Sequence, residues 1–291
     1  MSSSLGVDIG GTKIQFCTVD RDMVVTPLRL VPTALLRRGT RAFADDLASL
    51  ILSVKPSTCE TVGVSLNGVL DNGRVVFSGL MGGEVNFPLL EFLSDRLRST
   101  VFVDDDIHAM TVAEAKYGAG SSTDAFAMLN IGTGIGVGCY TDEVLRGRYA
   151  AGLISEQVIY VEELKEYRSL DRTVSGRGIK EIYHQLSGQT AEAINVFSQA
   201  QREDEAALAT VRIFSRYLGQ VLQLTSRFYH PEIIFLNGSI KHAAGDYLDA
   251  ALRSYSIDVG EPLRAEVQVS TLEHAAELGT LSQAQNYRDE G

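Results

Sequence analysis

The sequence contains no tryptophan, only three cysteines and only six prolines among its 291 residues. Three scattered cysteines, an odd number, argue against a disulfide framework and favour a reducing compartment. No stretch approaches the ~20 apolar residues that span a bilayer, and the first residues lack a cationic region followed by an apolar one. We therefore expect a cytoplasmic protein with no membrane partner.

Basic residues are also scarce, because Lys plus Arg number 26 against 37 Asp plus Glu, which gives a formal charge of −11. Binding to duplex nucleic acid needs a cationic surface that releases counterions, so nucleic acid is not an expected partner. A bound anion would have to be held locally, by backbone amides or by a metal ion. The 45% of apolar residues is typical of a soluble globular protein.

What the sequence does contain is an internal repeat. The segment 7–20 reads V-D-I-G-G-T-K-I-Q-F-C-T-V-D, and the segment 129–142 reads L-N-I-G-T-G-I-G-V-G-C-Y-T-D. An offset of 122 residues places Ile9 on Ile131 and Cys17 on Cys139. Each segment is typical of a strand, a tight glycine turn and a second strand. The repeat predicts two related domains.

Helical and strand patterns alternate elsewhere, which predicts an α/β fold. We expect helices over 43–54, 90–97, 107–117 and 214–228, and strands over 62–66, 101–103 and 233–236. Asp71-Asn72-Gly73 predicts a hairpin turn, and the charged segment 162–171, which has no clear period, is expected to be a surface connection. The expected domains span 1–110 and 111–291, and a last helix near 274–286 can pack back on the first domain.

The first glycine turn, Asp8-Ile9-Gly10-Gly11-Thr12-Lys13, combines a carboxylate, two glycines, a hydroxyl and an ammonium group. Such a turn can aim several backbone N–H groups at one anion, while Asp8 can hold Mg²⁺ through water and Thr12 can donate to a phosphate oxygen. Taken alone, it is equally well a plain hairpin with an incidental Asp. A second glycine turn, Gly132-Thr133-Gly134-Ile135-Gly136, favours a pair of turns that hold the phosphates of a nucleotide.

Three adjacent carboxylates, Asp104, Asp105 and Asp106, follow the strand over 101–103 and precede a helix. They can serve as N-caps, because an Asp oxygen accepts the unpaired N–H groups of a first helical turn. They also repel one another, which raises at least one pKa and favours a proton acceptor. Asp106, the nearest to the helix, is the candidate general base.

Five segments in chain order resemble signatures of the ROK sugar kinases, within the actin/hexokinase/Hsp70 superfamily. They are Val7–Lys13, Val103–Gly120, Ile131–Gly138, Val174–Ile179 and Ile234–Ile240. The resemblance implies two ribonuclease-H-like domains hinged around a cleft, with ATP and Mg²⁺ against the glycine turns and a sugar at the cleft floor. It also implies transfer of the γ-phosphoryl group of ATP to a sugar hydroxyl, and a homodimer.

The resemblance further implies roles for single residues. Asp106, eight positions before Glu114, aligns with the catalytic base of the family. The implied nucleotide-binding residues are Asp8, Gly10, Gly11, Thr12, Lys13, Gly132, Thr133, Gly134 and, near adenosine, Gly238. The implied sugar-binding residues are Asp105, which stands in place of an Asn, together with Glu156, Asp171, Asn67 and Gly68.

The chain departs from the family pattern mainly at the sugar positions. Ile159 replaces a common His, Asp171 replaces a longer Glu, and Leu80 stands where many members have Asn. No cysteine follows Cys139, so the cysteine-rich zinc loop of the family is missing and no structural zinc is expected. The expected substrate is a hexose-like sugar: glucose, an amino sugar such as kanosamine or N-acetylmannosamine, or a cyclitol.

Two other functions stay open at this level. A sugar- and nucleotide-binding regulator of the same family would carry a helix-turn-helix domain ahead of the first glycine turn, where only seven residues precede Asp8. An ATPase without a small substrate, such as a chaperone or a filament subunit, would need further insertions. Cys17 and Cys139 are expected to be small buried hydrophobic side chains, and His108 and His184 lack the paired spacing of metal ligands.

Overall fold

The structure, a computed structural model, describes residues 3–148 and 151–289. The chain divides into two compact units, each described by itself below. Unit 1 comprises Met1–Ser121, Arg146–Ala150 and Leu272–Gly291, and unit 2 comprises Ser122–Leu145 and Ala151–Thr271. Both units mix helices with a sheet, which confirms the α/β class.

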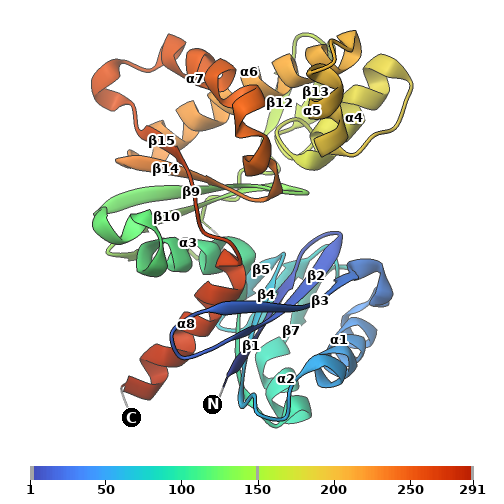
Figure 1. Cartoon of the computed structure of the whole chain (residues 1–291), viewed down its shortest axis with the longest axis vertical. Helices are drawn as coiled ribbons and strands as arrows, with labels where there is room; N and C mark the ends of the chain where they lie inside the picture. Colours follow the sequence, from blue (N-terminus) through green and yellow to red (C-terminus); the bar gives the residue numbers. More distant parts are fainter. Residues whose placement is uncertain (1–2, 149–150, 290–291) are drawn as a thin grey trace. The chain divides into compact units, whose positions relative to one another are not determined.

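Unit 1 is built on a five-stranded sheet in the order β3-β2-β1-β4-β8 (Figure 1). Strands β1, β4 and β8 run parallel, whereas β2 pairs antiparallel with both β1 and β3. The strands are β1 (Ser4–Ile9), β2 (Lys13–Val19), β3 (Val25–Pro32), β4 (Thr61–Leu66) and β8 (Thr100–Asp105). Every residue of β4 is buried, as expected of a central parallel strand covered on both faces.

Four helices cover the two faces of this sheet. Side chains of α1 (Thr40–Val54) and α2 (Leu89–Leu97) share one apolar core with the sheet. Side chains of α3 (Asp106–Tyr117) and α8 (Ala275–Asp289) pack with Cys17 and Val19 on the opposite face. Helix α3 lies wholly in unit 1, and the expected domain boundary after residue 110 falls inside it.

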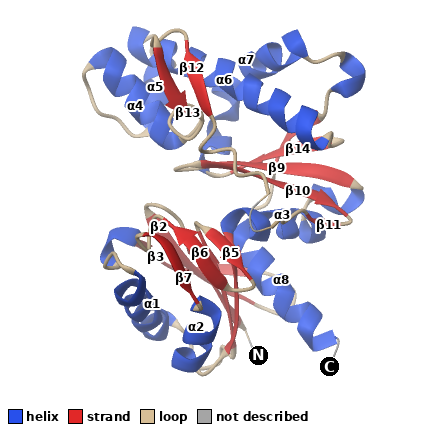
Figure 2. Ribbon diagram, turned by 180° about the vertical axis from the view of Figure 1, so that it is seen from behind, coloured by secondary structure: helices blue, strands red, loops and turns tan. Residues whose placement is uncertain are grey.

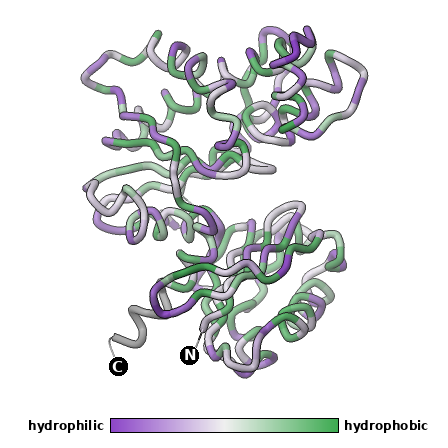
Figure 3. The backbone as a smooth tube through the Cα atoms, in the orientation of Figure 1, coloured by the Kyte–Doolittle hydropathy of each residue, from purple (hydrophilic) through white to green (hydrophobic). Residues whose placement is uncertain are grey.

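Unit 2 repeats the same sheet order, as β11-β10-β9-β14-β15 (Figure 2). Its strands are β9 (Ala125–Ile131), β10 (Ile135–Thr141), β11 (Glu143–Val144), β14 (Ile233–Asn237) and β15 (Glu266–Val269). Its helices are α4 (Gly176–Ser187), α5 (Ala193–Ala200), α6 (Glu205–Tyr229) and α7 (Ala244–Asp258). The central strands of both sheets carry the hydrophobic colouring in Figure 3, because they form the two cores.

The internal repeat corresponds to two equivalent hairpins, β1–β2 and β9–β10, as predicted. They differ in register by one residue, since Ile9 pairs with Ile14 whereas Ile131 pairs with Ile135. The first turn therefore has four residues and the second has three. Cys17 and Cys139 are both buried, as expected, but the one-residue difference places Cys17 opposite Gly6 and Cys139 opposite Ala127, which are not equivalent positions.

Local signals located most other elements correctly. The hairpin turn between β5 (Val69–Asp71) and β6 (Arg74–Ser78) is confirmed, with φ of 49° at Asn72 and 76° at Gly73. These strands form a small sheet with β7 (Gly83–Phe87). Short 3₁₀ helices occupy Thr33–Leu35, Ala119–Ser122, Ser239–Ala243 and Glu261–Leu263. Among the residues described, no helix has the length and apolarity needed to cross a bilayer.

The expectation of a surface connection over 162–171 is wrong. The segment contributes to a two-stranded antiparallel sheet of β12 (Val158–Val161) and β13 (Glu166–Ser169), turned at residues 162–165. Arg168, in β13, is 6% exposed and bonds Glu166 and Glu181 at 2.7 and 2.8 Å. The buried guanidinium of Arg168 is thus paired within the protein, and the charged composition of the segment did not indicate its strand.

Helices α3 and α8 approach most closely at Gly279. A Cβ atom there would lie 1.7 Å from the backbone oxygen of Ala109, so no side chain fits without separating the helices. We expect Gly279→Ala to lower the free energy of unfolding by about 1–3 kcal/mol or more, despite the better helix propensity of alanine. The midpoint of urea unfolding measures this. Gly245→Ala in α7 is the control, because a Cβ there meets nothing within 4 Å. Equal midpoints for the two variants would contradict the assigned contact.

Candidate active site

The three adjacent carboxylates stand where β8 passes into α3. Asp105 is the N-cap of α3, and its Oδ1 accepts the backbone N–H of His108 at 2.8 Å. Asp106 is the first residue of the helix, and its Oδ1 accepts the N–H of Ile107 at 3.1 Å. The capping role considered for these residues therefore belongs to Asp105.

Two of the three carboxylates have cationic partners. Arg146 donates two hydrogen bonds to Asp104, at 2.8 and 2.7 Å, and the imidazole of His108 forms an ion pair with Asp105. Burial favours a higher pKa for Asp104, but the bonds from Arg146 and His108 outweigh it and lower the pKa to about 2. Burial also opposes the charging of His108, yet its bonds to Asp104 and Asp105 raise its pKa to about 9. Asp104 is thus held as a carboxylate, and Asp105 is paired with the imidazole of His108.

Asp106 has a different environment. It is 9% exposed, and the side-chain amide of Asn67 donates to its Oδ2 at 3.3 Å. Burial and the negative charge of Asp105 raise the pKa of Asp106 to about 6, although the bond from Asn67 acts in the opposite direction. This agrees with the expectation that crowding would raise at least one of the three pKa values. Asp106 can therefore exchange a proton near neutral pH.

Asp8 lies one residue before the end of β1, and the hydroxyl of Ser65 on β4 donates to its Oδ1. Burial and the negative charge of Glu277 on α8 raise the pKa of Asp8 to about 8, and Asp106 contributes in the same direction. Unit 1 thus concentrates carboxylates in one region with little solvent. A cation bound at Asp8 would relieve this repulsion.

The first glycine turn directs its carbonyl groups into the protein. The hydroxyl of Thr33 donates to the Gly10 oxygen at 2.8 Å, and the Thr33 N–H donates to the Thr12 oxygen at 3.0 Å. Gly10 N–H closes the turn on the Lys13 oxygen at 3.0 Å, while Gly11, Thr12 and Lys13 are exposed. With the oxygens of Gly10, Thr12 and Lys13 bonded within the protein, the exposed side of the turn suits an anion.

The second glycine turn is anchored in a similar way, by helix α4. The N–H groups of Gly176 and Arg177 donate to the oxygens of Gly132 and Thr133 at 2.8 and 3.2 Å. A Cβ at Gly132 would meet nothing within 4 Å, so the space beside this glycine is open. The turn therefore combines occupied carbonyls with open space, as a phosphate-binding loop requires.

Asp171 lies against this second turn. Its Oδ1 accepts the N–H of Ile135 at 3.2 Å, and its Oδ2 accepts a bond from Arg177 at 2.8 Å. Burial raises its pKa, Arg177 opposes this, and the exposed Glu156 contributes a further increase. Asp171 thus lies beside Gly134, and Glu156 acts on it electrostatically within unit 2.

The remaining expected residues also have defined places. Gly68 follows Asn67, and a Cβ there would lie 2.6 Å from the Phe77 oxygen, so this loop packs tightly on β6. Gly238, with a φ of 86°, approaches the backbone oxygen of Ile131 so closely that a Cβ would lie 2.4 Å away. Only glycine fits at position 238, because the two backbone segments come so close. This position lies immediately beside the second turn.

Sequence patterns did not indicate several residues that shape the site. Arg146 and Ser65 are distant in the chain from the aspartates they bond, and Glu277 is distant from Asp8, on which its charge acts. His108 did carry a local signal, because positions three and four residues apart are neighbours on a helix and Asp104 and Asp105 stand at that spacing.

Two five-stranded sheets of the same order, each with a glycine turn in its β-hairpin, define a duplicated α/β fold. The model of the ROK family matches residues 4–285, and the chain belongs to that family.

Known proteins similar to the chain include two curated kinases. It is 28% identical over 281 residues to a glucokinase of Thermotoga maritima, with 87% of each chain covered. It is 24% identical over 285 residues to an N-acetylmannosamine kinase of Escherichia coli O127:H6, covering 95% of this chain and 96% of the other. A ROK family glucokinase from Streptomyces griseus, solved in complex with glucose and AMPPNP, matches with a TM-score of 0.83 and 22% identity over 98% and 99% of the two chains. This likeness confirms the fold expected from the sequence.

The charge on His108 should make the stability of the protein depend on pH. Its pKa is about 9 in the folded state against 6.5 for an unperturbed imidazole, so the stabilisation is full below pH 6.5 and is lost as the pH rises through 9. We expect the free energy of unfolding to fall over this range by up to roughly 3 kcal/mol more in the wild type than in His108→Gln. Urea unfolding at pH 6, 7.5 and 9 gives the comparison, with exposed His184→Gln as the control. Parallel curves for wild type and His108→Gln would refute the ion pair.

Proposed function

We propose that the protein transfers the γ-phosphoryl group of ATP to a hydroxyl of a hexose-like sugar, with Asp106 as the general base. That the protein is a sugar kinase follows from its family and from the curated kinases it resembles. The observation that carries the role of Asp106 is the contrast with its neighbours. Asp104 and Asp105 are paired with Arg146 and His108, whereas Asp106 is held at a pKa of about 6.

A pKa near 6 suits a general base at neutral pH. The carboxylate is then ionised in most molecules and still accepts a proton readily as the attacking oxygen loses it. Burial of the Asp106 side chain also limits the water that could compete with the sugar hydroxyl. The amide of Asn67, 3.3 Å from Oδ2, orients the carboxylate.

The residues of both glycine turns fit the phosphates of ATP, because their carbonyls are occupied within the protein and the space at Gly132 is open. Mg²⁺ would supply positive charge to the phosphate oxygens during transfer. Asp8 would hold it through water, and its crowding by Glu277 and Asp106 suits a hard cation. The nucleotide-binding residues we propose are Asp8, Gly10, Gly11, Thr12, Lys13, Gly132, Thr133, Gly134 and Gly238.

We propose Asp105, Asn67 and Gly68 in unit 1, and Glu156 and Asp171 in unit 2, as the sugar-binding residues. Two of the carboxylates already have partners, since Asp105 pairs with His108 and Asp171 with Arg177. Each retains acceptor capacity for a hydroxyl. The substrate proposed is glucose, an amino sugar such as kanosamine or N-acetylmannosamine, or a cyclitol.

The function is tested by coupled ADP production over a panel of hexoses, amino sugars, N-acylated sugars and cyclitols. We expect sugar-dependent ADP release, and we expect Asp106→Asn to lower kcat by about 10²–10⁴-fold while ADP still binds, because the variant removes only the proton acceptor. Asp95→Asn, at an exposed carboxylate of α2, is the matched control.

Three outcomes would count against the proposal. Near-normal turnover by a folded Asp106→Asn would refute the base assignment. Sugar binding without ADP release would favour the regulator considered above, and ATP hydrolysis indifferent to every sugar would favour an ATPase without a small substrate.

The pH profile gives an independent test of the base. The value of kcat/KM should rise with pH through about 6, because Asp106 accepts a proton only when ionised. Asn67→Ala removes the bond that lowers the Asp106 pKa. The acid limb of the kcat/KM profile of this variant should therefore move to higher pH. Asn195→Ala, at an exposed position of α5, should leave the limb unchanged. An acid limb that stays in place in Asn67→Ala would contradict the contact.

A further inference from the structure

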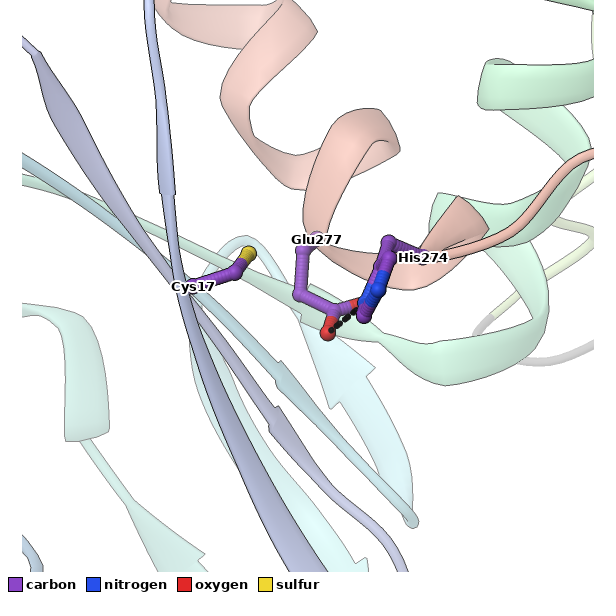
Figure 4. A group of neighbouring side chains, drawn as sticks. All are labelled: Cys17, His274 and Glu277. Carbon is purple, nitrogen blue, oxygen red and sulfur yellow. Dashed lines mark hydrogen bonds and ion pairs between the residues drawn. The ribbon is translucent and has the colours of Figure 1, made fainter. Parts of the chain in front are cut away.

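A separate group of metal-ligating side chains lies on the face of the unit 1 sheet that α8 covers (Figure 4). Cys17 comes from the middle of β2, His274 immediately precedes α8, and Glu277 lies in the first turn of that helix. One ligand atom from each residue, a sulfur, a nitrogen and an oxygen, lies within 4.8 Å of the other two. Figure 4 shows Cys17 and His274 pointing toward Glu277 from opposite sides, and Nδ1 of His274 is 3.2 Å from Oε1 of Glu277.

A glycine allows this convergence. Gly6 on β1 stands opposite Cys17 in the antiparallel ladder. A Cβ at Gly6 would lie 2.7 Å from the Cβ of Glu277 and 3.0 Å from the sulfur of Cys17. Any larger residue would therefore force Glu277 and Cys17 away from their present positions.

The group is largely buried, and its one carboxylate, that of Glu277, is paired with His274. Glu277 is 3% exposed and Cys17 is fully buried, while the side chain of His274 is 25% exposed. The carboxylate of Asp8 acts on Glu277 from the same face of β1, two residues beyond Gly6. Burying like charges is costly unless a cation compensates them. A divalent cation would balance one thiolate and one carboxylate.

We propose that Cys17, His274 and Glu277 form a binding site for a thiophilic divalent cation of the Zn²⁺ type. Thiolate, imidazole and carboxylate are the donors that Zn²⁺ uses in proteins, whereas Mg²⁺ prefers oxygen ligands alone. Three protein ligands leave a fourth position for water, which the half-exposed His274 makes accessible. Binding displaces the proton of the Cys17 thiol and any proton on His274, both of which pass to solvent.

The consequence of the site would be structural. The cation would join β2 to the start of α8, segments that stand at opposite ends of the chain. It would hold α8 on the sheet beside Asp8. The expectation of no structural zinc concerned a cysteine-rich loop after Cys139, and this site is assembled from other residues.

The second group with ligand spacing, Asp104, Asp105 and His108, carries no such proposal. Arg146 already forms a two-bond ion pair with Asp104 there, and a cation would have to displace it.

The test uses the full chain stripped of metal with a chelator and then titrated with Zn²⁺ or Co²⁺ alone. We expect one equivalent of Zn²⁺ to bind in the presence of excess Mg²⁺ and to raise the temperature of unfolding. Bound Co²⁺ should show a sulfur-to-metal charge-transfer band, which reports thiolate ligation directly. These readouts involve neither ATP nor sugar, so their failure is distinguishable from failure of the proposed kinase activity.

Three variants and one control make the assignment specific. Cys17→Ser, Glu277→Gln and His274→Asn should each weaken Zn²⁺ binding by at least about tenfold, and Cys17→Ser should abolish the charge-transfer band. Cys139→Ser, at a buried cysteine of β10 in unit 2, should change neither. His274→Asn is the variant safest to fold, because His274 is half-exposed and asparagine tolerates its φ of 55°.

Either of two results would overturn the proposal. One is Zn²⁺ affinity in His274→Asn equal to that of the wild type. The other is a charge-transfer band that is absent from the wild type or disappears only in Cys139→Ser.

Discussion

Unit 1 depends on a set of buried carboxylates, of which only some are paired with a positively charged side chain. Asp104 is paired with Arg146 and Asp105 with His108, and the pairing lowers the pKa of Asp104 to about 2. Asp106 and Asp8 lie in the same low-dielectric region, and burial and neighbouring negative charge raise the pKa of each. An acidic group that is not fully paired must either take up a proton or bind a cation. The first response fits a general base, and the second fits a metal site.

Close backbone approach is the complementary constraint, and it explains where glycine is indispensable. Because it has no side chain, Gly6 leaves room for Glu277 against the sheet, and Gly279 lets α8 pack against α3. Gly238 lies against the backbone of Ile131 for the same reason. Gly132 differs, because the space beside it is open rather than filled by protein. Glycines that serve packing are thereby distinguished from a glycine whose missing side chain leaves room for a ligand.

Local signals identified elements whose formation depends on a few neighbouring residues. The Asn72-Gly73 turn was predictable because both residues accept a positive φ. Helix α6 ends at Tyr229, with His230 as its C-cap directly before Pro231, because proline cannot continue a helix. The β12–β13 hairpin was not predictable. Its Arg168 is buried against Glu181 of α4, and a charged segment that folds against a distant partner has the composition of a surface loop.

The sequence by itself determined the two glycine hairpins, the α/β alternation and the run of three aspartates after a strand. It also determined the resemblance that names the family. All of these features are carried by residues adjacent in the chain. Only the tertiary structure decided that Asp104 pairs with a guanidinium, since Arg146 reaches it from 42 residues away. It alone brought Cys17 beside His274 and Glu277. Propensity and turn chemistry act over a few residues, whereas ion pairs and ligand clusters depend on which distant segments pack on the same face of a sheet.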